Sequence, residues 1–155
     1  MMQINFQTKS QQETFALGMA LVPFLKRGDV ITLSGDLGAG KTTLTTGVAR
    51  ALNVVDKVIS PTFNIMKCYF KATIPLYHID AYRLEDGNKD IGLEEFIEGD
   101  GITMIEWPQY IQELIPDNAI RISIKHVEGD IRDISIVLDD HHHELAKALK
   151  ERFSC

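Results

Sequence analysis

The sequence has few cysteines and no long apolar run, and each of these shortages excludes a class of protein. The two cysteines, Cys68 and Cys155, lie far apart, which fits neither a zinc-ligand spacing nor a secreted disulfide framework, so we expect reduced thiols. No apolar run approaches the roughly 18–20 residues of a membrane span, and residues 1–15 are too polar for a signal peptide. We therefore predict a cytoplasmic protein with no membrane association.

Basic residues are also fewer than acidic ones. The chain has 16 lysines and arginines against 22 aspartates and glutamates, a formal net charge of −6, which excludes a basic protein that coats nucleic acid. Its 155 residues are 45% hydrophobic and 25% charged, an ordinary globular composition. Such a chain buries roughly 68–70% of its surface on folding. We predict one domain over residues 1–155.

Hydrophobic periodicity predicts a chain in which strands and helices are mixed. Ser10 and Glu13 form a capping-box pattern that predicts the start of an amphipathic helix continuing to about Lys26 and ending at Gly28. The other expected helices cover 41–52, a short face at 93–97, and 141–153; the expected strands cover 3–6, 29–34, 62–69, 74–79, 101–106, 118–127 and 131–138, with a solvated loop at 85–90. This order predicts an α/β fold with a central mixed sheet flanked by helices.

A glycine-rich motif follows the buried strand at 29–34 and opens the helix at 41–52. It reads Gly35-Asp36-Leu37-Gly38-Ala39-Gly40-Lys41-Thr42 and matches the phosphate-binding loop pattern at every fixed position. Glycines let successive N–H groups converge on phosphate oxygens, the lysine supplies a positive charge, and the threonine hydroxyl is a ligand for Mg²⁺. We predict that these eight residues and Thr43 bind the phosphates of a nucleoside triphosphate together with Mg²⁺.

Two carboxylates end apolar strands and are candidates for the second half of such a site. Asp80 closes the run 76–80, and Glu106 closes the run 102–106. A nucleotide hydrolase needs a carboxylate that holds Mg²⁺ directly or through water, usually at a strand end. The sequence does not decide which of the two contacts the metal and which orients water.

Several classes of nucleotide enzyme can be compared with the chain. GTPases of the Ras type need a D-x-x-G switch and a guanine-reading motif, and the chain has neither. Small-molecule kinases commonly carry an arginine-rich lid, whereas the arginines here are scattered. A free-standing kinase and a nucleotide-gated binding module both remain open alternatives.

Four further motifs resemble one family. They are Ser60-Pro61-Thr62-Phe63, His78-Ile79-Asp80-Ala81-Tyr82-Arg83-Leu84, Leu93-Glu94-Glu95-Phe96 and Ile105-Glu106-Trp107-Pro108. In this order and at this length they are similar to the TsaE (YjeE) family, the small P-loop ATPases of bacterial tRNA threonylcarbamoyladenosine synthesis. The resemblance implies a P-loop NTPase-like three-layer fold and an ATPase that works with the TsaD and TsaB proteins and reaches tRNA only through that complex.

The resemblance also implies roles for individual residues. Lys41, Asp80 and Glu106 would be catalytic, with Glu106 and Thr42 at the metal and Asp80 as the Walker-B-like aspartate. Trp107, Ser60 and Thr62 would sense the nucleotide or the partner. A plain Ser-Pro turn and core packing of the tryptophan remain open alternatives for these residues. Ser10 and Arg132 would contact the base or the sugar.

The histidines indicate neither a metal site nor a catalytic base. The run His141-His142-His143 cannot chelate a metal from one helix face, because consecutive helical residues point about 100° apart, so we expect a solvated helix start. His78 stands inside an apolar run, where a histidine more often supports a neighbouring group than acts as a base.

Overall fold

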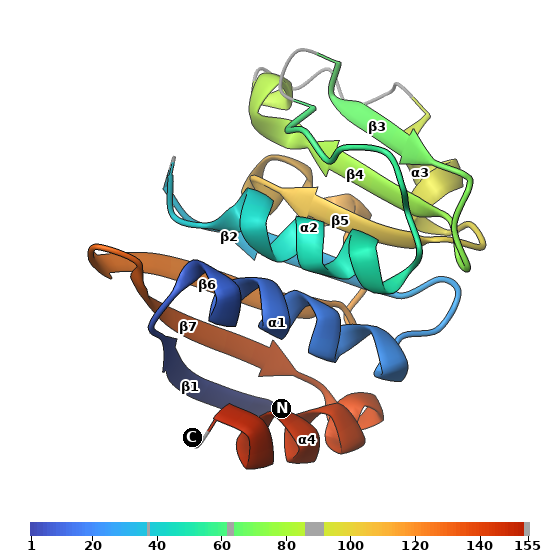
Figure 1. Ribbon diagram of the computed structural model, residues 1–155. Helices are drawn as coiled ribbons and strands as arrows, with labels where there is room; N and C mark the ends of the chain where they lie inside the picture. The colour runs from blue at the N-terminus through green and yellow to red at the C-terminus, as the bar shows by residue number, and fades with distance from the viewer. Residues whose placement is uncertain (37, 62–63, 86–91, 154–155) are drawn as a thin grey trace.

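The described residues form one mixed sheet with helices on both faces (Figure 1). The computed structural model describes residues 1–36, 38–61, 64–85 and 92–153. In spatial order the strands are β1 (Met2–Thr8), β7 (Ile131–Leu138), β6 (Ile120–Glu128), β2 (Val30–Ser34), β5 (Ile102–Glu106), β4 (Leu76–Asp80) and β3 (Met66–Tyr69). The helices are α1 (Gln11–Leu21), α2 (Lys41–Ala51), α3 (Leu93–Ile97) and α4 (His143–Phe153). The predicted α/β fold class is confirmed.

Strand β2 lies at the centre and leads directly into the glycine-rich loop. It pairs in parallel with β5 on one side and β6 on the other, and its residues from Val30 to Leu33 are all buried. Strand β4 also runs parallel to β5, whereas β1, β7 and β6 form an antiparallel set and β3 pairs antiparallel with β4. Because β2, β4 and β5 run the same way, the residues that follow them meet at one edge of the sheet.

Two cores cover the two faces of the sheet and explain the three layers. On one face, apolar residues of α1, α2 and α4 pack on strand residues such as Ile31, Leu33 and Met104. On the other face, α3 and the short 3₁₀ segments Ala81–Leu84 and Pro108–Leu114 pack on Val30 and other strand residues. Among the described residues no helix is long and apolar enough to cross a membrane.

Helices α1 and α2 lie side by side in close contact (Figure 1). A Cβ atom added to Gly47 of α2 would overlap the carbonyl oxygen of Phe15 and lie 3.2 Å from Cα of Gly18. A Cβ atom added to Gly18 of α1 would overlap the carbonyl oxygen of Leu44. The two backbones therefore approach as closely as two glycines permit.

Three expectations need correction. The first helix ends at Leu21 rather than near Lys26, because Pro23 follows and lacks the N–H that an α-helix requires; a short 3₁₀ turn takes its place. His142 is not solvated: it is buried, and its Nε2 bonds to the carbonyl of Asn118. The strand predicted from 62 begins at Met66.

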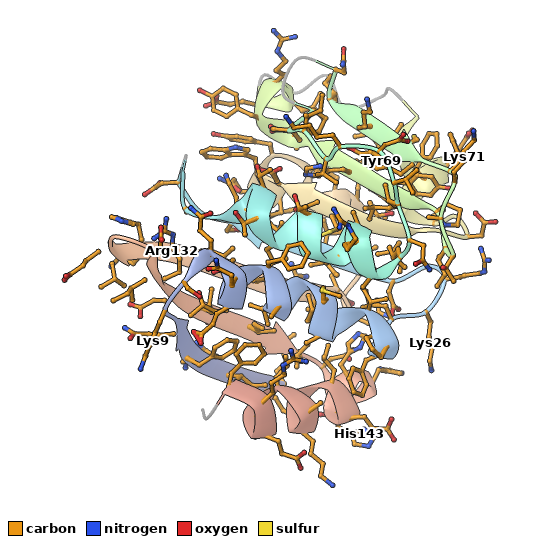
Figure 2. All side chains as sticks on the ribbon, viewed as in Figure 1. Lys9, Lys26, Tyr69, Lys71, Arg132 and His143 are labelled. Atoms are coloured by element: carbon orange, nitrogen blue, oxygen red, sulfur yellow. The ribbon has the colours of Figure 1, made fainter. Side chains whose placement is uncertain are left out.

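The other two histidines of that run agree with the expectation, and parts of three predictions lie outside the described residues. His141 and His143 are exposed, and Figure 2 shows His143 on the outer side of α4. The loop residues 86–90, the strand residues 62 and 63, and Cys155 fall outside the described part of the chain. Cys68 is a free thiol.

Candidate functional site

The glycine-rich loop connects β2 to α2 and has the backbone geometry of an anion-binding turn. Gly38 and Gly40 have φ angles of 78° and 109°, values that side chains other than hydrogen rarely permit. Gly40 occupies the N-cap position, and α2 begins at Lys41. The free N–H groups of the first helical turn and the helix dipole therefore point toward the loop, which favours a bound anion.

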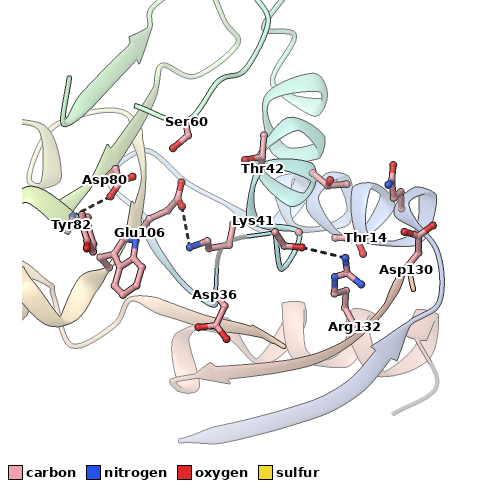
Figure 3. A pocket seen from close by; sticks show the side chains of 15 residues that line it. Thr14, Asp36, Lys41, Thr42, Ser60, Asp80, Tyr82, Glu106, Asp130 and Arg132 are labelled. Atoms are coloured by element: carbon pink, nitrogen blue, oxygen red, sulfur yellow. Dashed lines mark hydrogen bonds and ion pairs between the residues drawn. The ribbon is translucent and has the colours of Figure 1, made fainter. Parts of the chain in front are cut away.

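A pocket of about 610 Å³ lies against this loop (Figure 3). Asp80 and Tyr82 stand at one end, Asp130 and Arg132 at the other, and Lys41 between them (Figure 3). Among the described residues, the pocket is lined by Gln11, Thr14, Asp36, Gly38, Gly40, Lys41, Thr42, Thr43, Ser60, Asp80, Tyr82, Glu106, Trp107, Asp130 and Arg132. The pocket is large enough for a nucleotide-sized ligand.

Lys41 is buried and held by three neighbours. Its Nζ donates to the carbonyl oxygen of Gly35 at 2.7 Å and lies 3.5 Å from Oε1 of Glu106. The same Nζ stands 5.2 Å from the centre of the Trp107 ring, within the range of a cation–π contact. An arriving phosphate would therefore compete with partners that the lysine already has.

Glu106 and Asp80 lie directly side by side, because β4 and β5 pair in parallel with these two residues in register. Nε2 of His78 donates to Oε2 of Glu106 at 2.6 Å, and Nδ1 of His78 has no partner among the described residues. Burial alone would raise the pKa of Glu106, but its hydrogen bond with His78 and the charges of His78 and Lys41 outweigh burial and lower that pKa. Glu106 is thus held as a carboxylate.

This arrangement predicts how Glu106 affects stability at acid pH. Because its pKa is lower in the folded chain than the ordinary value of 4.5, Glu106 stabilises the fold above pH 4.5, and this contribution disappears as pH falls through the folded pKa. Glu106→Gln leaves Lys41 without its charged partner, so we expect a loss of about 1–3 kcal/mol at pH 7. Urea unfolding at several pH values should show that the difference between wild type and variant shrinks below pH 4.5. A constant difference would contradict this assignment.

The oxygen atoms in the pocket suit Mg²⁺. The Thr42 hydroxyl and the carboxylates of Asp80 and Glu106 line the same space, and Ser60 adds a second hydroxyl (Figure 3). Mg²⁺ prefers oxygen ligands and usually takes only one or two from protein carboxylates, the rest coming from phosphate and water. Among the described residues, no three His, Cys, Asp or Glu side chains form a cluster that could hold a metal ion.

Trp107 has an unusual backbone for its size. Its φ and ψ are 57° and 52°, in the left-handed region, which costs a residue with a side chain about 1–2 kcal/mol. The turn brings its ring beside Lys41 and packs it edge-on against Tyr82, with centroids 5.1 Å apart. Strain of this kind is commonly retained where a side chain must face a site.

The structure brings most of the predicted residues together. Gly35 and Ala39 contribute through carbonyl oxygens that accept from Lys41 and Arg132. Ser10 does not line the pocket: its hydroxyl accepts from the N–H of Glu13 and caps α1. Leu37 and Thr62 lie outside the described residues.

Four lining residues were not singled out from the sequence. Gln11 and Thr14 lie in the first turn of α1, just after Ser10, and Tyr82 and Asp130 are two residues from Asp80 and Arg132. Tyr82 belongs to the motif around Asp80 and was open to prediction. The others come from distant segments whose approach depends on the strand order.

Known proteins resemble this chain over most of its length. The family model described as "Threonylcarbamoyl adenosine biosynthesis protein TsaE" matches residues 8–134. A Bacillus subtilis protein named tRNA threonylcarbamoyladenosine biosynthesis protein TsaE is 42% identical over 94% of this chain and 92% of its own. A protein of the same name from Treponema pallidum is 33% identical over 83% and 96%. The crystal structure of Bacillus subtilis YdiB superimposes with a TM-score of 0.82 at 35% identity, covering 97% of this chain and 95% of that one.

Proposed function

Because the chain belongs to the TsaE family of threonylcarbamoyl adenosine biosynthesis proteins, we propose that it is the ATP-binding and ATP-hydrolysing subunit of tRNA threonylcarbamoyladenosine synthesis. In this proposal it acts in the cytoplasm with TsaD and TsaB, which modify the adenosine 3′ to the anticodon of ANN-decoding tRNAs. It reaches tRNA only through that complex, and its ATP hydrolysis permits repeated turnover.

One observation carries the proposal: the glycine-rich loop faces two strand-end carboxylates across a single pocket. Lys41 and Thr42 come from the start of α2, and Asp80 and Glu106 come from the ends of β4 and β5. A phosphate-binding loop opposite such carboxylates is what hydrolysis of a nucleoside triphosphate requires.

The residues have separate tasks in this mechanism. The loop N–H groups and the N-terminus of α2 bind the phosphates. Nζ of Lys41 replaces its contacts with the Gly35 carbonyl and the Glu106 carboxylate by contacts with phosphate oxygens. Thr42 and Glu106 would hold Mg²⁺, which when bound neutralises charge on the phosphates. Asp80, whose Oδ1 accepts from the N–H of Tyr82 at 3.0 Å, would orient the attacking water. Ser60 lines the same pocket near the carboxylates and would respond to the terminal phosphate.

We expect slow hydrolysis by the isolated chain. Transition-state charge in phosphoryl transfer is commonly stabilised by an arginine. Arg132, the arginine among the described lining residues, donates to backbone carbonyls of the loop and of its own hairpin. A partner protein that completes the site would therefore accelerate the reaction.

The test compares ATP hydrolysis by the wild-type chain and by Lys41→Ala, each alone and with purified TsaD and TsaB. Removing the lysine should lower hydrolysis by about 10²–10³, the usual loss for one charge-stabilising group. We expect the partners to stimulate only the wild-type chain, and tRNA modification to stop after about one turnover with Lys41→Ala. Lys67→Ala, on β3 and outside the pocket lining, is the control.

The opposite result would refute the proposal. If TsaD and TsaB leave the rate of ATP hydrolysis unchanged, and tRNA modification proceeds through many turnovers with Lys41→Ala, the chain does not drive turnover. A phosphorylated small molecule among the products would then favour a kinase.

A further inference from the structure

Arg132 joins the β6–β7 hairpin to the phosphate-binding loop. It is the second residue of β7, and Figure 2 shows it where the hairpin approaches the loop. Its Nε donates to the carbonyl of Ala39 at 2.7 Å, and its Nη2 donates to the carbonyl of Gly38 at 3.3 Å. Its Nη1 donates to the carbonyls of Gly129 at 2.6 Å and Ile131 at 3.1 Å. The guanidinium thus links two loop carbonyls to two hairpin carbonyls.

These contacts decide the direction of the next N–H group in the loop. A peptide unit is planar and trans, so its N–H points away from its C=O. The carbonyl of Ala39 and the N–H of Gly40 belong to one peptide unit, and that carbonyl points at Arg132. The N–H of Gly40, a lining residue, is therefore turned away from Arg132.

The same contacts leave Arg132 little capacity for the nucleotide itself. A guanidinium has five N–H donors, and four of those of Arg132 are used by main-chain carbonyls. The resemblance described above implies a contact of Arg132 with the base or the sugar. The geometry favours an action through the loop instead.

We propose that Arg132 is a positioning residue that braces the phosphate-binding loop by holding the carbonyls of Gly38 and Ala39, so that the loop is shaped for phosphate before any nucleotide binds. This inference rests on the proposed function only in naming phosphate as the ligand. The brace itself is a property of the nucleotide-free chain.

Two variants separate the brace from the charge. Arg132→Lys keeps the positive charge and most of the stem but has no planar fork of donors, and Arg132→Gln removes the charge. Lys125→Gln removes a positive charge from an exposed position on the same hairpin, outside the pocket lining, and is the control. Thermal unfolding of each variant confirms that it is folded.

The first measurement is amide hydrogen exchange in the nucleotide-free protein. The N–H of Ala39 donates to the carbonyl of Asp36 at 3.0 Å, and the N–H of Leu44 donates to the carbonyl of Gly40 at 3.0 Å, so these two amides are protected in the nucleotide-free chain. Losing the Arg132 hydrogen bonds to the loop should make both amides exchange about tenfold faster in the two Arg132 variants, and not in Lys125→Gln. The second measurement is binding of ADP and of inorganic tripolyphosphate, which has no base or sugar. We expect both affinities to fall about tenfold in the Arg132 variants.

Three results would overturn the inference. Wild-type exchange and binding in Arg132→Lys would mean that only the charge matters, and a loss confined to ADP would indicate a base or sugar contact. Faster exchange over the whole sheet would indicate general destabilisation. Failure of the proposed function is distinct: a wild-type chain that binds neither ADP nor tripolyphosphate refutes nucleotide binding, while the exchange comparison, made without ligand, still tests the brace.

Discussion

Replacing Glu106 with glutamine is expected to reduce Mg²⁺-dependent ATP hydrolysis by about 10²–10³ while ADP binding changes only a few-fold. The glutamine side chain has nearly the same volume, so the pocket keeps its shape. It lacks the negative charge that balances Lys41 and that we assign to the metal. Phosphate binding by the loop backbone does not depend on this charge, which is why binding and hydrolysis should separate.

The measurement is steady-state hydrolysis at increasing Mg²⁺, beside a direct ADP titration. Glu144→Gln, an exposed change on α4, controls for the loss of one carboxylate. Asp80→Asn is the informative comparison, because an asparagine still accepts from the N–H of Tyr82. If Asp80→Asn raises the Mg²⁺ requirement and Glu106→Gln does not, Asp80 is the metal ligand and our assignment is reversed.

Gly47→Ala is expected to lower the free energy of unfolding by about 1–3 kcal/mol, the usual cost of overfilling a packed contact. Gly47 lies inside α2, where replacing glycine by alanine normally raises stability by about 0.5–1 kcal/mol. Here the added methyl group would overlap the carbonyl oxygen of Phe15, so α1 and α2 must separate. The expected sign is therefore opposite to that of helix propensity.

Urea unfolding measures this change in the free energy of unfolding. In thermal unfolding, the midpoint temperature should fall by about 2–4 °C per kcal/mol lost. Gly18→Ala should act in the same direction, because its methyl group would meet the carbonyl of Leu44. Arg50→Ala, at an exposed position in the last turn of α2, is the control for a change within the helix. A Gly47→Ala chain as stable as the wild type would show that the helices separate without cost.

The parts of the fold that could be predicted from the sequence are those with local causes. The strand, glycine-rich loop and helix from Val30 to Ala51 follow from a buried apolar run, positive-φ glycines and helical periodicity. The end of α1 at Leu21 also has a local cause, because Pro23 stops the helix although the apolar periodicity continues to about Lys26.

The pocket rim could not be predicted in the same way. Thr14 and Arg132 approach Gly40 because the strands lie in the spatial order β1-β7-β6-β2, which pairs distant parts of the chain. Nor does the sequence reveal that the Arg132 donors reach carbonyls of the loop, because that depends on the direction of individual peptide units.

The glycine contact between α1 and α2 also has a mechanical consequence. The first turn of α1 carries Gln11 and Thr14, and the first turn of α2 carries Lys41 and Thr42, all of which line the pocket. Two helices whose backbones touch cannot slide past or rotate against each other without breaking that contact. The side of the pocket formed by α1 and α2 therefore behaves as one rigid unit. Any change in the width of the pocket must then come from the other lining segments, which carry Tyr82 at one end and Asp130 and Arg132 at the other.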